Sequence, residues 1–123
     1  MFEKAGLSSL ERLIGRDVSA VCFVRTYVQL IFEDVTFTCY TCPSVSISEK
    51  RFETSSAGYR DALCGLIGQT VQSVLERPRK ELTLDFESGD RIEVSLRFED
   101  SSSVEAAMLH ATGGEIFDVW RYE

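Results

Sequence analysis

The fold of this chain is decided by a stretch that occurs twice, as "LIGRDVSAV" at residues 13–21 and as "LIGQTVQSV" at residues 66–74. In both copies two apolar residues precede a glycine, Gly15 in the first and Gly68 in the second. Glycine readily adopts the left-handed conformation that ends a helix. The apolar residues after each glycine follow the period of a strand. The repeat therefore predicts two copies of one unit, in which a helix ends at a glycine and the chain continues into a sheet.

The residues before each glycine predict the two helices. In the second copy, apolar residues recur at the spacing of one helix face, at Tyr59, Ala62, Leu63, Leu66 and Ile67. In the first copy Leu10, Leu13 and Ile14 occupy the matching positions. Ser8 and Glu11 have the spacing of a capping box, which places the start of the first helix near Ser8. We expect these apolar side chains to face the core.

Alternation of apolar and polar residues predicts three strands in each copy. The expected buried faces of the last two strands are Val28, Leu30, Phe32, Val35, Phe37 and Cys39 in the first copy, and Leu82, Leu84, Phe86, Ile92, Val94 and Leu96 in the second. Pairing of buried with buried positions sets the register of each hairpin. It predicts that Phe32 faces Val35 and that Phe86 faces Ile92. On the outer face it places Asp85 opposite Glu93.

These elements predict a single α+β domain over residues 1–123. It consists of two helix-plus-antiparallel-meander repeats, at residues 7–54 and 59–100, related by pseudo-twofold symmetry, because one copy cannot cover its own apolar sheet face. One more short strand is expected around Val45 to Ile47, giving roughly six to eight strands in all. The C-terminal segment 101–123 is predicted to form a short helix, capped by Ser102 and Glu105, and a last strand.

The charge of the chain is unevenly distributed. The formal net charge is −7, yet residues 1–81 hold ten acids and ten bases, so the excess lies in residues 82–123. An acidic surface repels nucleic acid and favours basic partners. No apolar run reaches the roughly 18 residues of a membrane span, and the start, "MFEKAGLSSLER", lacks the apolar segment of a secretion signal. We therefore expect a cytoplasmic protein that binds neither nucleic acid nor a membrane.

The four cysteines do not form a redox or metal motif. Cys39 and Cys42 are spaced as C-x-x-C, but they lie in the alternating stretch "VTFTCYTCP" and not at a helix start, where a redox thiol needs its lowered pKa. On a regular strand they point to opposite faces. A zinc site would also require Cys22, Cys64 or His110 to converge on them. We expect reduced thiols, no metal and no cofactor.

Catalytic signatures are weak. His110, the only histidine, is expected near the end of the C-terminal helix, without a recognisable nucleophile. Asp85 and Glu93, if opposite each other, could divide acid and base roles, but an open sheet face favours two solvated carboxylates. The basic cluster Arg77 to Lys80 could grip a phosphate, but it is better interpreted as a solvated turn. The sequence therefore predicts a protein that is not an enzyme.

The stretches "LIGRDVSAV…YVQLIFED…P" and "GYRDALCGLIGQTV…LTLDFESGDRIEVSL" resemble a family of small uncharacterised bacterial proteins. The resemblance covers most of the chain and carries no catalytic motif. By type and composition the chain is also similar to immunity proteins of bacterial toxin systems, including contact-dependent growth inhibition. This similarity implies a partner, a basic cytotoxic domain that the acidic chain binds and neutralises.

The leading hypothesis is therefore an immunity protein that binds a basic toxin domain through an acidic surface. The expected binding residues are Asp85, Glu87, Asp90, Glu93, Glu99 and Asp100, with Trp120 as an exposed anchor. One alternative is a small-ligand binder or enzyme that uses the cleft between the two repeats. Another is a homodimeric module that joins through the uncharged face around Tyr27, Ile31 and Tyr40.

Overall fold

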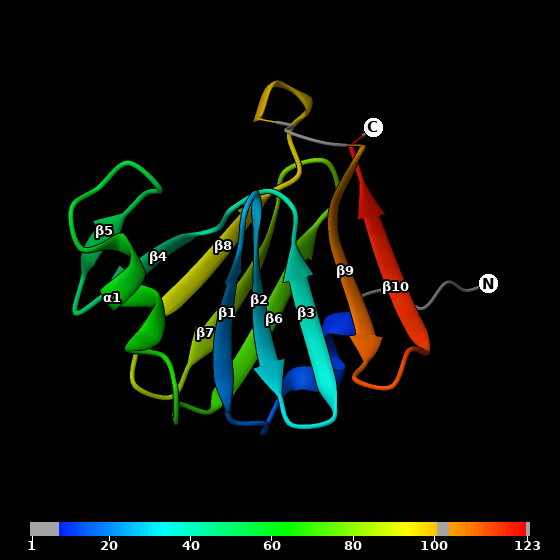
Figure 1. Ribbon diagram of the computed structural model, residues 1–123, viewed down its shortest axis with the longest axis horizontal. Helices are drawn as coiled ribbons and strands as arrows, with labels where there is room; N and C mark the ends of the chain where they lie inside the picture. The colour runs from blue at the N-terminus through cyan, green and yellow to red at the C-terminus, as the bar shows by residue number, and fades with distance from the viewer. Residues whose placement is uncertain (1–7, 101–103, 123) are drawn as a thin grey trace.

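A computed structural model describes residues 8–100 and 104–122 and shows a mostly β protein. Ten strands form two five-stranded antiparallel sheets, which Figure 1 shows one in front of the other. Sheet one has the order β1 (Ala20–Val24), β2 (Tyr27–Phe32), β3 (Val35–Cys39), β9 (Glu105–Ala111), β10 (Ile116–Arg121). Sheet two has the order β5 (Lys50–Phe52), β4 (Ser44–Ile47), β8 (Arg91–Ser95), β7 (Glu81–Phe86), β6 (Val71–Arg77). The expected short strand around Val45 is thus confirmed, as half of a hairpin.

Helix is scarce, so the expected α+β class is corrected to mostly β. The first expected helix is one 3-10 turn, η1 (Ser9–Leu13), and the second is the short α1 (Tyr59–Cys64). The predicted cap is confirmed, because the Ser8 hydroxyl accepts a hydrogen bond from the backbone N–H of Leu10 at 3.1 Å. Ile14 and Ile67 were expected in the core but are 45% and 48% exposed. Both helices end before these residues, so the helical spacing does not extend to them.

Each meander receives a hairpin from the other half of the chain. The first meander, β1–β2–β3, is extended by β9 and β10, which come from the C-terminal end of the sequence. The second, β6–β7–β8, is extended by β4 and β5, which follow the first meander directly. This exchange makes both sheets composites of the two halves and gives ten strands, more than the six to eight expected.

The two copies of the repeated stretch contact each other directly. The backbone N–H of Gly15 donates to the carbonyl of Val71 at 2.9 Å, and that of Gly68 donates to the carbonyl of Val18 at 2.8 Å. These two bonds join equivalent positions of the repeat in opposite directions. Gly15 and Gly68 also share a left-handed backbone, with φ of 85° and 91°, as the sequence predicts. The repeated stretch therefore links the two sheets at one end of the sandwich.

The predicted C-terminal helix is wrong. Glu105–Ala111 is strand β9, which pairs with β3 through Leu109 opposite Phe37 and Ala107 opposite Cys39. Its residues favour helix by intrinsic propensity, but burial of one face against a neighbouring strand overrides propensity. Ser102, the expected cap, lies outside the described residues. The expected last strand is confirmed as β10.

The hairpin registers were predicted with different success. In the first hairpin Phe32 faces Val35 and Leu30 faces Phe37, as expected. In the second, Ile92 faces Leu84 and not Phe86, a shift of two residues. The turn lies one residue earlier than expected, at residues 87–89 instead of 88–90, and is closed by a bond from the N–H of Phe86 to the carbonyl of Asp90 at 2.9 Å. A shift of two keeps every side chain on its face, so the predicted core residues remain buried.

The core fills the space between the sheets. Its largest fully buried side chains are Phe32, Phe37, Phe86, Leu10, Leu13, Leu30, Leu63, Leu66, Leu82, Leu84, Ile92 and Leu109. They come from both meanders, β9 and the two helical turns, so neither half has a core of its own. Within the described residues, no helix has the length and apolar character needed to span a bilayer.

Candidate binding surfaces

Asp85 and Glu93 lie on the outer face of sheet two, but they do not form an acidic surface. The register places Asp85 opposite Arg91, so the expected opposition of two carboxylates is wrong. Arg91 Nε lies 2.7 Å from Asp85 Oδ1, and an Arg51 guanidinium nitrogen lies 2.8 Å from Glu93 Oε1. The hydrogen bonds that Arg51 donates to Glu53 and Glu93 raise its pKa, and the bond that Arg91 donates to Asp85 raises the pKa of Arg91. The carboxylates of this face are paired with arginines of the same face. The face therefore has little free negative charge with which to attract a basic partner.

Asp90 has a structural role and is not part of an exposed binding surface. Its side chain is buried, and its two carboxylate oxygens accept bonds from the N–H of Ser48 and from the Gln69 amide, both at 3.0 Å. It thereby joins the β7–β8 turn to the β4–β5 turn and to the loop before β6. Glu87, in the same turn, is exposed.

Glu99 and Asp100 lie in the 3-10 turn η2 (Phe98–Asp100), at the end of the sandwich opposite the β7–β8 turn. Both are exposed, and Asp100 accepts a bond from the Ser95 hydroxyl at 2.6 Å. The predicted acidic residues are thus divided between two ends and one sheet face.

Trp120 is a core residue, so its expected role as an exposed anchor is not available in this fold. It is only 6% exposed and meets Phe37 edge to face, with ring centroids 6.1 Å apart. Its indole Nε1 donates to Glu76 Oε2 at 3.0 Å, and Glu76 Oε1 accepts from the Ser8 hydroxyl at 2.5 Å. These contacts connect β10 in sheet one with β6 in sheet two.

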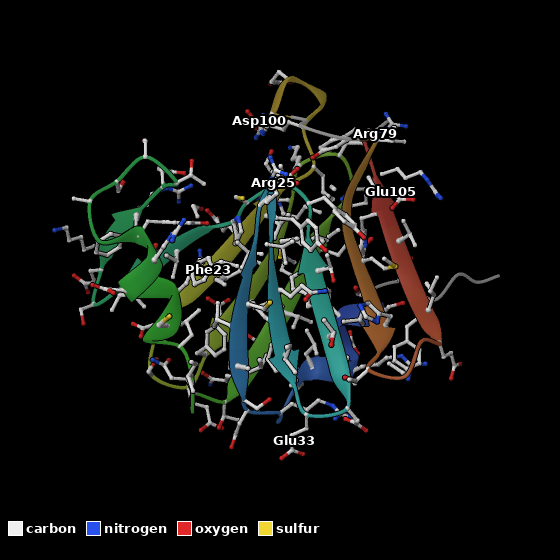
Figure 2. All side chains as sticks on the ribbon, in the orientation of Figure 1. Phe23, Arg25, Glu33, Arg79, Asp100 and Glu105 are labelled. Atoms are coloured by element: carbon white, nitrogen blue, oxygen red, sulfur yellow. The ribbon has the colours of Figure 1, made fainter. Side chains whose placement is uncertain are left out.

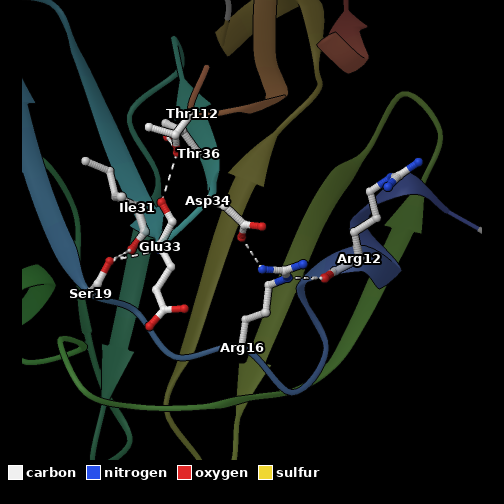
Figure 3. A network of polar contacts seen from close by, with 8 residues as sticks. All are labelled: Arg12, Arg16, Ser19, Ile31, Glu33, Asp34, Thr36 and Thr112. Atoms are coloured by element: carbon white, nitrogen blue, oxygen red, sulfur yellow. Dashed lines mark hydrogen bonds and ion pairs between the residues drawn. The ribbon is translucent and has the colours of Figure 1, made fainter. Parts of the chain in front are cut away.

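The structure brings together a group of carboxylates at one end of the sandwich that the sequence pattern does not predict. We define this acidic rim as the exposed residues Asp17, Glu33, Asp34, Glu87 and Glu115. They come from the loops between strands, where no periodic pattern marks them. Of these, sequence reasoning had selected only Glu87. The loops also carry one arginine, Arg16, which pairs with Asp34 (Figure 3).

Hydrogen bonds connect the loops of the rim. Figure 3 shows the Ser19 hydroxyl accepting from the N–H of Glu33 at 3.0 Å, and the Thr112 hydroxyl donating to the carbonyl of Glu33 at 3.0 Å. The rim continues to sheet two through Thr70, whose hydroxyl donates to Asp17 at 2.5 Å and whose carbonyl accepts from the N–H of Glu87 at 2.9 Å. Loops of both sheets therefore form one connected edge.

Glu33 is held in an unfavourable backbone conformation at the tip of the β2–β3 turn. Its φ is 61°, a region that few residues other than glycine, asparagine and aspartate adopt. The bond that its N–H donates to Ser19 and the bond that its carbonyl accepts from Thr112 hold it there. Its side chain lies at the tip of the turn, as the label in Figure 2 shows.

The outer face of β2 and β3 is uncharged, as the sequence indicates. The rings of Tyr27 and Tyr40 lie in tilted contact, with centroids 5.3 Å apart and an angle of 60° between their planes, and Gln29 donates to the Thr38 hydroxyl at 3.1 Å. His110 lies on β9 beside this face, 3.4 Å from the Thr38 hydroxyl, and not at a helix end as expected.

The four cysteines of the chain form no disulfide, and the pKa shifts of Cys39 and Cys42 are opposite in direction to those of redox cysteines. Burial raises the pKa of both Cys39 and Cys42. A raised pKa depletes the thiolate, which is the reactive form. Within the described part of the chain, no three histidine, cysteine or acidic side chains are grouped to hold a metal ion.

A groove of about 760 Å³ lies on the outer side of sheet two, towards the end opposite the rim. Its walls include Ser44 of β4, Glu93 and Ser95 of β8, and Thr41 and Cys42 from the crossover between the sheets. Its lining comes from both predicted repeats, with residues within 26–54 from the first and residues within 80–100 from the second, and it includes Thr26 from the β1–β2 turn of sheet one.

Comparison with known proteins finds no matching family model, no matching curated protein and no matching solved structure.

Proposed function

We propose that this chain is a non-catalytic immunity protein, which acts in the cytoplasm by binding a basic toxin domain through the acidic rim. The observation that carries the proposal is the composition of the rim, where five exposed carboxylates lie on neighbouring loops and only Asp34 is ion-paired, with Arg16, among the described residues. Loops on a rigid sandwich present such groups without further ordering. A concentrated negative field of this kind speeds encounter with a cationic partner and excludes nucleic acid.

The binding surface is moved from the second hairpin to the end of the sandwich. Asp85 and Glu93 are ion-paired within the chain, and a partner would have to replace those arginines to use them. The rim carboxylates Glu33 and Glu87 have no ion pair among the described residues. They remain available to lysine and arginine side chains of a partner.

We also propose that the two repeats are related by a pseudo-twofold axis, and that this axis explains how the rim is assembled. The reciprocal bonds between the two copies of the repeat, and the matching addition of a hairpin to each meander, support an axis through the Gly15–Gly68 contact. Such an axis brings Asp17 and Thr70, equivalent residues of the repeat, together in an isolated bridge. The duplicated contact would then be what builds the rim.

The test is a binding titration and an association-rate measurement against the candidate toxin domain encoded beside this chain. In the double variant Glu33→Lys with Glu87→Lys, the association rate at low salt should fall by about tenfold or more, and its salt dependence should weaken. The matched control is Asp61→Lys with Glu99→Lys, which makes the same change in net charge at exposed positions away from the rim.

Equal losses in the two double variants would show that net charge matters and the rim does not. Failure of the wild-type protein to bind or neutralise the toxin domain would refute the immunity function. If the wild-type protein then sedimented as a dimer, the uncharged face of β2 and β3 would become the better-supported binding surface.

A further inference from the structure

The groove on the outer side of sheet two contains positively charged side chains that are not neutralised by the carboxylates around them. Its lining includes four carboxylates and three cations, which are Glu53, Glu81, Glu93, Asp100, Arg51, Lys80 and Arg97. The carboxylates all have partners within the chain. Glu53 and Glu93 bind Arg51, Glu81 binds Arg77 at 3.0 Å, and Asp100 accepts from the Ser95 hydroxyl.

Two of the three cations have no such partner. In the described part of the chain, no carboxylate lies within ion-pair distance of Lys80 or Arg97. In a protein of net charge −7, a groove whose unneutralised side chains are both positive is the reverse of the average surface. The free charge of the groove therefore favours an anion.

A backbone contact brings the chain at Lys80 close to the chain just before Arg97. The carbonyl of Lys80 accepts a bond from the N–H of Leu96 at 2.9 Å, and both cationic residues line the same groove. The N–H of Arg97 donates to the Ser95 hydroxyl at 3.1 Å. Lys80 ends the basic turn between β6 and β7, and Arg97 follows β8, so both come from the same end of sheet two, and both line the groove.

The remainder of the groove wall is rich in hydroxyl groups. Its hydroxyl residues are Thr26, Thr41, Ser44, Thr54 and Ser95. Thr41 is 7% exposed, and its Oγ1 has no hydrogen-bond partner in the described structure. A buried hydroxyl without a partner is uncommon in native proteins and calls for an explanation. The wall thus combines polar groups with unused bonding capacity and carboxylates that can accept from a ligand.

We propose that this groove binds a phosphate monoester of a small polyhydroxylated molecule, with the phosphate between Lys80 and Arg97. A phosphate monoester carries about −1.5 to −2 charges at neutral pH, which matches two free cations. The groove volume lies within the range of small-molecule sites. Hydroxyls of the ligand would donate to Glu81 and Glu93 and exchange bonds with the serine and threonine side chains. This site is independent of the acidic rim.

The test is isothermal titration calorimetry at low ionic strength with ribose 5-phosphate, ribose and inorganic phosphate as separate probes. Wild-type protein should bind ribose 5-phosphate and should give no signal with ribose. Affinity for ribose 5-phosphate should fall at least about tenfold in the double variant Lys80→Gln with Arg97→Gln. Arg79→Gln is the matched control, since Arg79 lies in the same basic turn but does not line the groove.

The outcomes separate the parts of the proposal. Absence of binding by the wild-type protein, or equal affinity in the double variant, would overturn it. Inorganic phosphate bound as tightly as ribose 5-phosphate would overturn the polyhydroxylated part. Equal loss in Arg79→Gln would show a diffuse charge effect and no groove site. Circular dichroism of each variant verifies that the exposed substitutions leave the fold intact.

Discussion

Replacement of Trp120 by phenylalanine tests whether this side chain stabilises the fold or anchors a partner. Phenylalanine keeps an aromatic ring against Phe37 but removes the indole N–H that donates to Glu76 at 3.0 Å. A hydrogen bond to a charged group contributes about 1.5–3 kcal/mol, and Glu76 keeps the Ser8 hydroxyl as a second donor, so the lower half of that range applies. The smaller ring adds roughly 1 kcal/mol through lost apolar burial.

We therefore expect Trp120→Phe to lower the free energy of unfolding by about 2.5–3 kcal/mol, which corresponds to a fall in Tm of roughly 10 °C. Urea unfolding followed by circular dichroism measures this. Ile116→Ala is the control on the same strand, and because Ile116 is 58% exposed its effect should stay within about 0.5–1 kcal/mol. A double-mutant cycle with Glu76→Gln should show about 1 kcal/mol of coupling. Unchanged stability of Trp120→Phe together with weakened toxin binding would refute this reasoning and restore the anchor.

Two further predictions concern buried groups. Asp90→Ala should lower the free energy of unfolding by about 2–4 kcal/mol, because Ser48 and Gln69 lose their acceptor. The control Glu87→Ala should change the free energy of unfolding by less than about 0.5 kcal/mol. Equal effects of the two substitutions in urea unfolding would show that Asp90 is not buried in solution. Burial holds the pKa of the Cys39 thiol above its ordinary value of 9.0, so above pH 9 the unfolded chain binds fewer protons than the folded one and stability falls with rising pH. The slope due to this thiol should reach up to about 1.4 kcal/mol per pH unit and should be absent in Cys39→Val, and parallel stability–pH curves for the two proteins would contradict it.

The sequence by itself determined the strands of the two meanders and the faces that they bury. Leu82, Leu84 and Phe86 alternate with polar residues, and a period of two leaves only one face to bury. The first hairpin register followed as well, because two residues, Glu33 and Asp34, join its strands and leave no room for a longer turn. The paired glycines were recognised because a left-handed residue after an apolar face is a local requirement.

Tertiary structure alone decided the features that depend on contacts distant in sequence. Segment 105–111 is a strand because β3 offers an edge to pair with, although its composition favours helix. The second hairpin turn lies one residue earlier than expected, and its Asp90 carboxylate bonds to Ser48 and Gln69, contacts that no local pattern records. The same holds for the surfaces. Asp85 is neutralised by the arginine opposite it across the second hairpin. The acidic rim, in contrast, collects carboxylates from loops of both meanders and of the β9–β10 hairpin, which the packing of the two sheets brings to one end. Charge is additive along a chain, but its effect on a partner depends on distance, and distance is set by the fold.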